Sequence, residues 1–239
     1  MSRILVLAKS GFGKTFSMAN IPELNHKGLD PKITYIISVT SKPLPFRKSG
    51  ELYKVAKESD PTSGNRFITN DPEKIASLIE SLIDSPYKNI VIDDFNYIMQ
   101  DYYMDNAMKG GWDTPKKIGY FMGKIFKAIE KYKDIDKDII VLAHSEDVPN
   151  ANGDGRTFAK LKTTGKMVDD YVTPEGKFDV TLVGRSRYDM SAKKVIKEFI
   201  TNEDEFVSSP KSPYGMFKYL YIPNDLGLVL DTVHEYYKG

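Results

Sequence analysis

The chain has 239 residues, of which 41% are hydrophobic and 28% charged, and its formal net charge is +1. This length suits one α/β domain with a sizeable core, so we expect a single domain over residues 1–239. With so little net charge, any contact with nucleic acid must come from a local basic patch. The chain has no cysteine, which excludes disulfides and thiolate metal sites, and its three histidines lie too far apart in sequence to favour zinc. No apolar run approaches the roughly 20 residues that span a bilayer, so we expect a soluble, cytoplasmic protein without membrane contact.

The first predicted elements are a strand, a glycine-rich loop and a helix. Residues 2–8 are predicted to form a strand, because the run from Ile4 to Ala8 is apolar without alternation, which is typical of a buried parallel strand. A loop over 9–13 follows, and then a helix from Lys14 to about Asn20, before Pro22 blocks its continuation. β-Branched residues predict a second strand over 33–39.

The rest of the chain continues to alternate between strands and helices. After the second strand, we expect a polar surface segment to about residue 64, a helix over 72–84 capped by Asp71, and a strand over 89–94. Residues 95–133 are predicted to be mainly helical with a break near 110–112, and a strand over 138–144 follows. A polar mobile loop over 145–165, a pair of strands at 178–183 and 195–200, and a last helix after residue 225 complete the prediction. This alternation predicts an α/β fold with a mainly parallel central sheet and helices on both faces. Such sheets bind ligands at the carboxyl ends of their strands.

Residues 8–15, Ala-Lys-Ser-Gly-Phe-Gly-Lys-Thr, fit the P-loop pattern with alanine in place of its first glycine. Backbone N–H groups would wrap the β-phosphate, helped by the positive end of the following helix. Lys14 would bridge the β- and γ-phosphates of ATP, and the Thr15 hydroxyl would ligate Mg²⁺. The predicted nucleotide-binding residues are Ser10, Gly11, Phe12, Gly13, Lys14, Thr15 and Phe16.

Two further strands end in polar residues that suit phosphate chemistry. Asp93 follows the run 90–92, as in a Walker B strand, and would hold Mg²⁺ mostly through bound waters. Asp94 is the candidate for orienting or deprotonating the attacking water. His144 could reach a γ-phosphate as a sensor, or be a histidine hydrogen-bonded at the surface. Glu146 and Asp147 are alternative acids, or solvated loop residues.

In this order, the motifs resemble those of phage-encoded RecA-like ATPases. These are AAA-type ATP-binding proteins of tailed phages, related to the RecA/RadA core and to ATP-dependent single-strand annealing proteins. The resemblance covers almost the whole chain and is carried by residues 39–47, 91–95, 143–146, 164–167, 211–217 and 222–226. It implies a RecA-like P-loop fold and ATP hydrolysis coupled to single-stranded DNA in phage recombination or replication. It also implies a homo-oligomer with ATP at the subunit interfaces.

Two departures from RecA leave the activity open. RecA-like proteins usually have a catalytic glutamate at the end of the second strand, where this chain offers Ser38, Thr40 and Ser41. In RecA the residue after the Walker B aspartate is a serine, whereas in this chain Asp94 follows Asp93. Hydrolysis therefore relies on Asp94 or is slow, which leaves a nucleotide-dependent assembly or switch protein as the alternative. A small-molecule kinase is disfavoured, because no lid with clustered arginines is evident.

The resemblance also suggests DNA contacts and a cation donated in trans. The candidates for DNA binding lie in 108–117 and 150–166, with solvated basic loops as the alternative; they are Lys109, Trp112, Lys116, Lys117, Arg156, Phe158, Lys160, Lys162 and Lys166. Lys211 is the candidate cation for the ATP of a neighbouring subunit. Arg185 and Arg187 are alternatives to it, and Lys211 could equally be an ordinary surface lysine.

Overall fold

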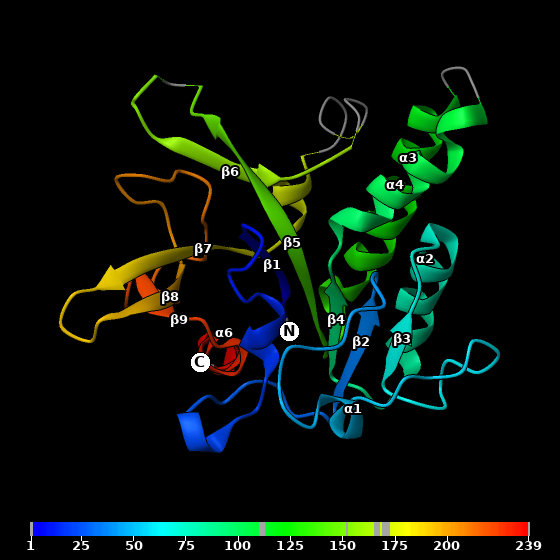
Figure 1. Ribbon diagram of the computed structural model, residues 1–239, viewed down its shortest axis with the longest axis horizontal. Helices are drawn as coiled ribbons and strands as arrows, with labels where there is room; N and C mark the ends of the chain where they lie inside the picture. Colours follow the sequence, from blue (N-terminus) through cyan, green and yellow to red (C-terminus); the bar gives the residue numbers. More distant parts are fainter. Residues whose placement is uncertain (1, 110–112, 152, 165–167, 169–172, 239) are drawn as a thin grey trace.

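The sheet order places the P-loop strand near the middle of the molecule (Figure 1). The computed structural model describes residues 2–109, 113–151, 153–164, 168 and 173–238. Its main sheet has the strand order β3-β2-β4-β5-β1-β7-β8-β9, and β6 pairs with β5 off this path. The strands are β1 Arg3–Ala8, β2 Thr34–Ser38, β3 Arg66–Ile68, β4 Asn89–Asp93, β5 Asp138–Pro149, β6 Thr157–Leu161, β7 Val180–Asp189, β8 Lys194–Ile200 and β9 Tyr221–Pro223. The strands from β3 to β7 in this order pair in parallel, and β8 and β9 are antiparallel to their neighbours.

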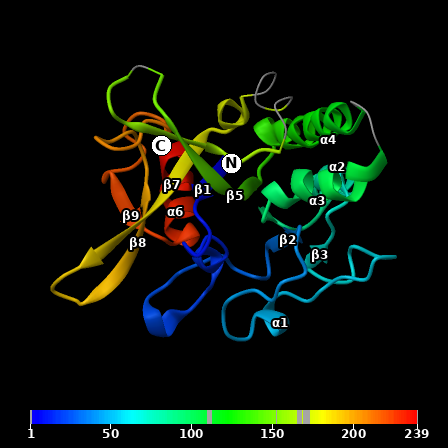
Figure 2. The same cartoon turned by 45° about the horizontal axis from the view of Figure 1, so that its top comes forward.

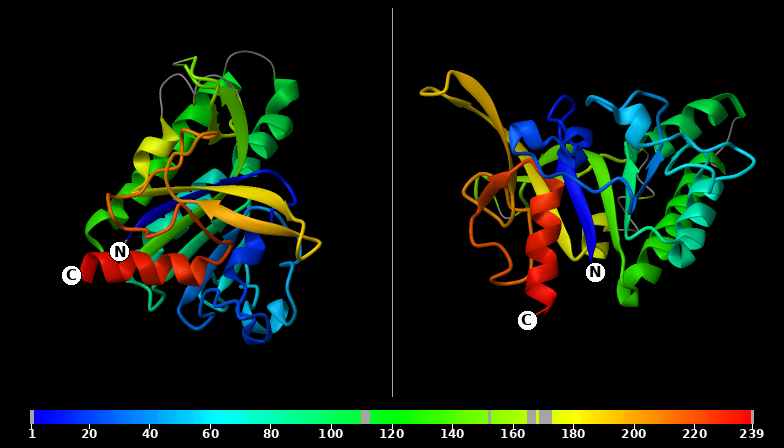
Figure 3. Two further views of the ribbon diagram at one scale, coloured as in Figure 1. Left: turned by 90° about the vertical axis from the view of Figure 1, so that its left-hand side faces the viewer. Right: turned by 90° about the horizontal axis from the view of Figure 1, so that it is seen from below.

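Helices cover both faces of this sheet (Figures 2 and 3). The helices are α1 Ser49–Leu52, α2 Pro72–Ser81, α3 Asn96–Asn106, α4 Asp113–Glu130 and α6 Leu226–Lys238, with short 3₁₀ turns η1 Thr15–Met18, η2 Pro22–Leu24, η3 Leu82–Asp84, η4 Ala107–Lys109, η5 Lys131–Asp134 and η6 Pro174–Lys177. Alternate residues of β1 face two separate cores, as the period of a strand requires. Leu5 and Leu7 lie in the core under α2, α3 and α4. Ile4 and Val6 lie in the core under α6 and η1. The predicted fold class is therefore confirmed.

The local sequence determines where α2 begins. Asp71 precedes the helix, and its Oδ1 accepts hydrogen bonds from the backbone N–H of Glu73 at 2.9 Å and of Lys74 at 3.3 Å. Pro72 occupies the first helical position, where its missing N–H costs nothing. Such a cap stabilises the helix by about 1 kcal/mol. No helix in the described part of the chain is long and apolar enough to cross a membrane.

The helix predicted after the P-loop is wrong in type and length. Only the 3₁₀ turn η1 forms, and the backbone becomes extended at Ala19. The Ser17 hydroxyl donates to the carbonyl of Lys14, so this side chain competes for a group that an α-helix would use. The backbone N–H of Leu29 donates to the carbonyl of Met18, which commits the chain to a turn.

The segment 145–165, predicted as a loop, is partly strand. β5 continues to Pro149 and forms an antiparallel hairpin with β6, with Ser145 opposite Leu161 and Pro149 opposite Thr157. The hairpin leaves the sheet at the top of Figure 1. In β6, the buried residues 159 and 161 alternate with less buried ones. The glycines of the preceding turn made this segment look like a loop in the sequence. Gly153 and Gly155 adopt φ values of 64° and 80°, which favour glycine.

Candidate nucleotide site at the carboxyl ends of the strands

The P-loop leaves β1 in a conformation that depends on its glycines and on one buried ring. Gly11 and Gly13 have φ values of 77° and 99°. The Phe12 side chain points into the core and packs on Phe199, with ring centroids 5.8 Å apart. It lies so close over Gly184 that a Cβ there would be 2.6 Å from the ring. Phe12 therefore anchors the loop with its side chain and offers a ligand only its backbone.

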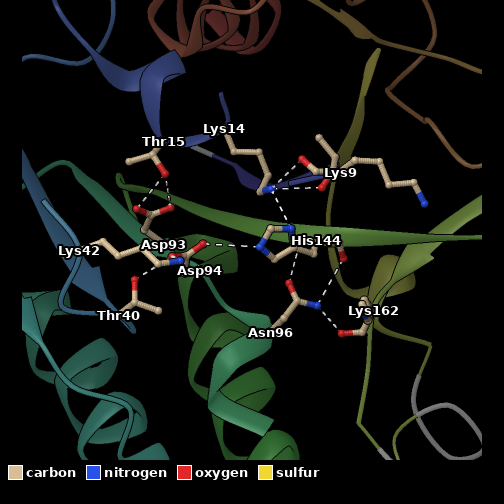
Figure 4. Close-up of polar contacts among 11 residues, drawn as sticks. Lys9, Lys14, Thr15, Thr40, Lys42, Asp93, Asp94, Asn96, His144 and Lys162 are labelled. Atoms are coloured by element: carbon tan, nitrogen blue, oxygen red, sulfur yellow. Dashed lines mark hydrogen bonds and ion pairs between the residues drawn. The ribbon is translucent and has the colours of Figure 1, made fainter. Parts of the chain in front are cut away.

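The Lys14 side chain extends back to the first residues of its own loop (Figure 4). Its Nζ donates to the carbonyls of Ala8 at 3.1 Å and of Lys9 at 3.4 Å, and it lies 3.2 Å from Nδ1 of His144. Burial lowers the pKa of Lys14 to about 8, although the nearby carboxylates of Asp94 and Asp93 oppose the shift. A phosphate would therefore meet an ammonium that is still mostly charged at neutral pH.

Thr15 and Asp93 form a pair of oxygen groups beside this lysine. The Thr15 hydroxyl lies 3.0 and 3.1 Å from the two carboxylate oxygens of Asp93. Burial raises the pKa of Asp93 to about 7, and the charge of Asp94 adds to the shift. A buried carboxylate next to a second one is stabilised by a cation, and hydroxyl and carboxylate oxygens are ligands that Mg²⁺ prefers. These residues therefore fit a magnesium ion.

Asp94 is held in place by the segment that follows β2. Its φ of 63° lies in the left-handed region, which aspartate tolerates better than most residues. The Thr40 hydroxyl donates to Oδ2 at 2.7 Å, and Lys42 Nζ lies 3.8 Å from the same oxygen. The end of the second strand thus supplies no carboxylate, but it positions the carboxylate that comes from β4. Lys42 was not among the predicted site residues, although it lies within the segment 39–47 that carries the resemblance.

His144 faces both Lys14 and Asp94. Its Nε2 lies 3.8 Å from Oδ1 of Asp94. Burial and the charge of Lys14 lower the pKa of His144, so the ring is neutral at neutral pH. Because the ammonium of Lys14 can only donate, Nδ1 accepts and the ring proton belongs on Nε2, directed toward Asp94.

Asn96 ties His144 to the β5–β6 hairpin. Its Oδ1 accepts from the His144 N–H, and its Nδ2 donates to the His144 carbonyl at 3.3 Å and to the Lys162 carbonyl. This buried amide bonds both strands where the hairpin leaves the sheet. Sequence reasoning missed Asn96, because one asparagine near a helix start resembles an ordinary cap.

Other predicted residues lie around the loop without joining this cluster. Ser10 is exposed, and the Phe16 ring packs edge-on against His26 at 5.0 Å. Asp147 pairs with Lys9 at 2.9 Å and so links the P-loop to the hairpin. Glu146 is exposed on β5.

The candidate DNA-binding residues, and the cations predicted to act on the ATP of a neighbouring subunit, lie outside this cluster. Arg156 pairs with Asp154 and Glu203, both at 2.8 Å. Lys160 lies on β6, Lys162 just beyond it, Lys109 in η4, and Lys116 and Lys117 on α4, whereas Trp112 and Lys166 fall outside the described residues. Lys211 pairs through its backbone with Thr181, which lies opposite Leu5 in β1 and not at the P-loop. Arg185 and Arg187 both pair with Glu198. Their roles toward a neighbouring subunit stay predictions.

A cavity of about 860 Å³ lies at the opposite end of the sheet from the P-loop. Its charged walls include Arg3 paired with Asp179 at 2.6 Å and Lys88 paired with Asp136 at 3.0 Å. These two pairs neutralise their own charges. None of the residues predicted to bind phosphate or magnesium lines this cavity.

The sequence matches no protein-family model and no curated protein. The structure is similar to that of a KaiC-like protein from the hyperthermophilic archaeon Pyrococcus horikoshii OT3, with 12% sequence identity and a TM-score of 0.45. The similarity covers 83% of this chain and 77% of that chain. It concerns the arrangement of strands and helices and says nothing about what this chain binds.

Proposed function

We propose that the chain is a Mg²⁺-dependent, RecA-like ATPase. The observation that carries this proposal is the convergence of Lys14, Thr15, Asp93, Asp94 and His144 at one edge of the sheet. They come from the loop after β1 and from the ends of β4 and β5. Lys14 contacts His144, His144 faces Asp94, and Thr15 contacts Asp93, whose pKa the charge of Asp94 raises. No single motif in the sequence requires this convergence.

The P-loop and Lys14 would bind the phosphates. Lys14 now donates to two neutral carbonyls, and phosphate oxygens are stronger acceptors for an ammonium. Thr15 and Asp93 would hold the magnesium ion, which supplies positive charge at the phosphate oxygens when bound. The raised pKa of Asp93 makes this carboxylate ready to exchange a proton for a metal ion near neutral pH.

Asp94 is the carboxylate we assign to the attacking water. Thr40 holds one oxygen of Asp94, and the other faces Nε2 of His144 across 3.8 Å, too far for a direct hydrogen bond. That oxygen can therefore accept a proton from a water, while the N–H of His144 can donate to a phosphate oxygen.

The β5–β6 hairpin is the surface we assign to single-stranded DNA. In β6, Phe158 and Lys160 alternate with the buried residues 159 and 161, so they lie on the face away from the core, and Arg156 comes just before the strand. Bases stack on such aromatic rings while cations contact the phosphates. Arg156 would exchange its two carboxylate partners for phosphate. Together with the resemblance, this hairpin supports a role in phage DNA recombination or replication, in a homo-oligomer that Lys211 helps to complete.

One observation favours a second candidate, a nucleotide-dependent assembly or switch protein with little hydrolysis. Asn96 bonds both His144 and the Lys162 carbonyl, so a movement of His144 on nucleotide binding would be passed to the hairpin even without turnover.

Steady-state phosphate release from Mg-ATP, measured with and without single-stranded DNA, separates these candidates. The ATPase proposal predicts Mg²⁺-dependent release that single-stranded DNA increases. Tight ATP binding without release would identify the switch protein, and absence of ATP binding would contradict both.

A further inference from the structure

The side of the P-loop that faces β8 carries a lysine of its own. Lys197 Nζ donates to the carbonyl of Gly11 at 2.7 Å. The same nitrogen lies 3.7 Å from the point that a Cβ on Gly13 would occupy. Lys197 is exposed. A cation from β8 therefore touches the loop on the flank opposite to Asp93 and Asp94.

The period of the strand explains why this lysine reaches the loop. Lys197 comes two residues before Phe199 on β8, so both side chains point to the same face of the sheet. Phe199 packs on Phe12 under the P-loop. The next side chain on that face therefore lies beside the loop itself. Asn224 strengthens the arrangement, since its Nδ2 donates to the carbonyl of Gly13 at 3.1 Å.

The charge of Lys197 is not balanced as the charges of its neighbours are. Lys9 pairs with Asp147 at 2.9 Å, and Lys42 lies 3.8 Å from Asp94. Within the described ranges, Lys197 forms no ion pair with a carboxylate, and its ammonium donates to the neutral carbonyl of Gly11. An ammonium has three donors, and phosphate oxygens bind them more strongly than a carbonyl does. A triphosphate also carries more negative charge than Lys14 and one Mg²⁺ together neutralise.

We propose that Lys197 is a second phosphate-binding lysine of the nucleotide site, contributed by the same chain as the P-loop. Its flexible stem lets Nζ move from the Gly11 carbonyl to an oxygen of the bound polyphosphate. The inference rests on the proposed function, because it assigns the ligand of that same site.

The test measures the affinity of the full chain for Mg-ATP, ADP and inorganic tripolyphosphate by calorimetry. Lys197→Met removes the charge and the donor, whereas Lys197→Gln removes the charge and keeps a donor for the Gly11 carbonyl. Lys194→Met is the matched control, because Lys194 is an exposed lysine of the same strand at its far end. Circular dichroism establishes that each variant is folded.

We expect both Lys197 variants to bind ATP and tripolyphosphate about tenfold more weakly than wild type, with a loss that shrinks as salt is added. Lys194→Met binds like wild type. Full affinity in Lys197→Gln would show that the residue only supports the loop and would overturn the proposal, as would full affinity in Lys197→Met. A wild-type chain that binds no ATP would overturn the proposed function itself, and this inference with it.

Discussion

The two flanks of the P-loop are built in opposite ways. On the β4 flank, Asp93 is only 6% exposed and lies beside a second carboxylate. On the β8 flank, Phe12 and Phe199 form an apolar floor over Gly184, and the charged group, Lys197, stays exposed. A buried carboxylate with a raised pKa is stabilised by a bound metal ion, whereas apolar packing holds the conformation of the loop without any ligand. The β8 flank is therefore organised without a ligand, and we expect a bound metal ion to complete the β4 flank.

The largest expected effect comes from the lysine between the flanks. Lys14→Ala should abolish productive ATP binding, because it removes the buried ammonium that neutralises the phosphates while the loop amides only cradle them. Calorimetric titration with Mg-ATP measures this. Lys88→Ala is the control, since Lys88 is an exposed lysine at the other end of the sheet. A folded Lys14→Ala protein with unchanged affinity and turnover would rule out the P-loop assignment.

On the β4 flank, Asp94→Asn should keep Mg-ATP binding and lower turnover at least tenfold, about 1.4 kcal/mol at the transition state. Asparagine also tolerates the left-handed φ of this position, so the backbone is preserved. Phosphate release under saturating Mg-ATP measures the effect. Turnover like that of wild type would transfer the role to another acid, such as Glu146.

The same flank should make magnesium binding depend on pH. Since folding raises the pKa of Asp93 from its ordinary value of 3.8 to about 7, its contribution to stability is fully present below 3.8 and is lost as pH rises through 7. Mg²⁺ competes with the proton, so its affinity should be about tenfold weaker near pH 6 than near pH 8. Thermal melts across Mg²⁺ concentrations at both values measure this difference. An equal response at the two values, or one that Asp93→Asn retains, would contradict the assignment of Asp93.

The smallest expected effect lies on the β8 flank. In Gly184→Ala, the new Cβ would lie 2.6 Å from the Phe12 ring and 2.7 Å from the Ala8 Cβ. Such overpacking costs about 1–3 kcal/mol of unfolding free energy. Because Phe12 belongs to the P-loop, ATP affinity should also fall several-fold. Denaturant unfolding and ATP titration measure both changes. Gly123→Ala is the control, since nothing lies within 4 Å of its Cβ position, and equal behaviour of the two variants would refute this role of Phe12.

The strands and the residues at their carboxyl ends could be predicted because each buried strand is a continuous apolar run that stops at a polar residue. This rule found Asp93, Asp94 and His144, and the P-loop pattern found Lys14. It could not find Lys42, Asn96 or Lys197, which reach the site from neighbouring elements and belong to residue types common on surfaces. The helix after the P-loop was mispredicted because the Ser17 hydroxyl bonds the backbone carbonyl of Lys14. The β5–β6 hairpin was missed because its turn glycines conceal the alternation of β6.

The most direct test of the central claim is the affinity of the wild-type chain and of Asp93→Asn for ATP, each measured with Mg²⁺ and with a chelator. If Thr15 and Asp93 hold the metal ion on the buried flank, Mg²⁺ should strengthen ATP binding at least tenfold in the wild type, or about 1.4 kcal/mol. Asp93→Asn should lose most of that gain. Equal ATP affinity with and without Mg²⁺ in the wild type would contradict the account.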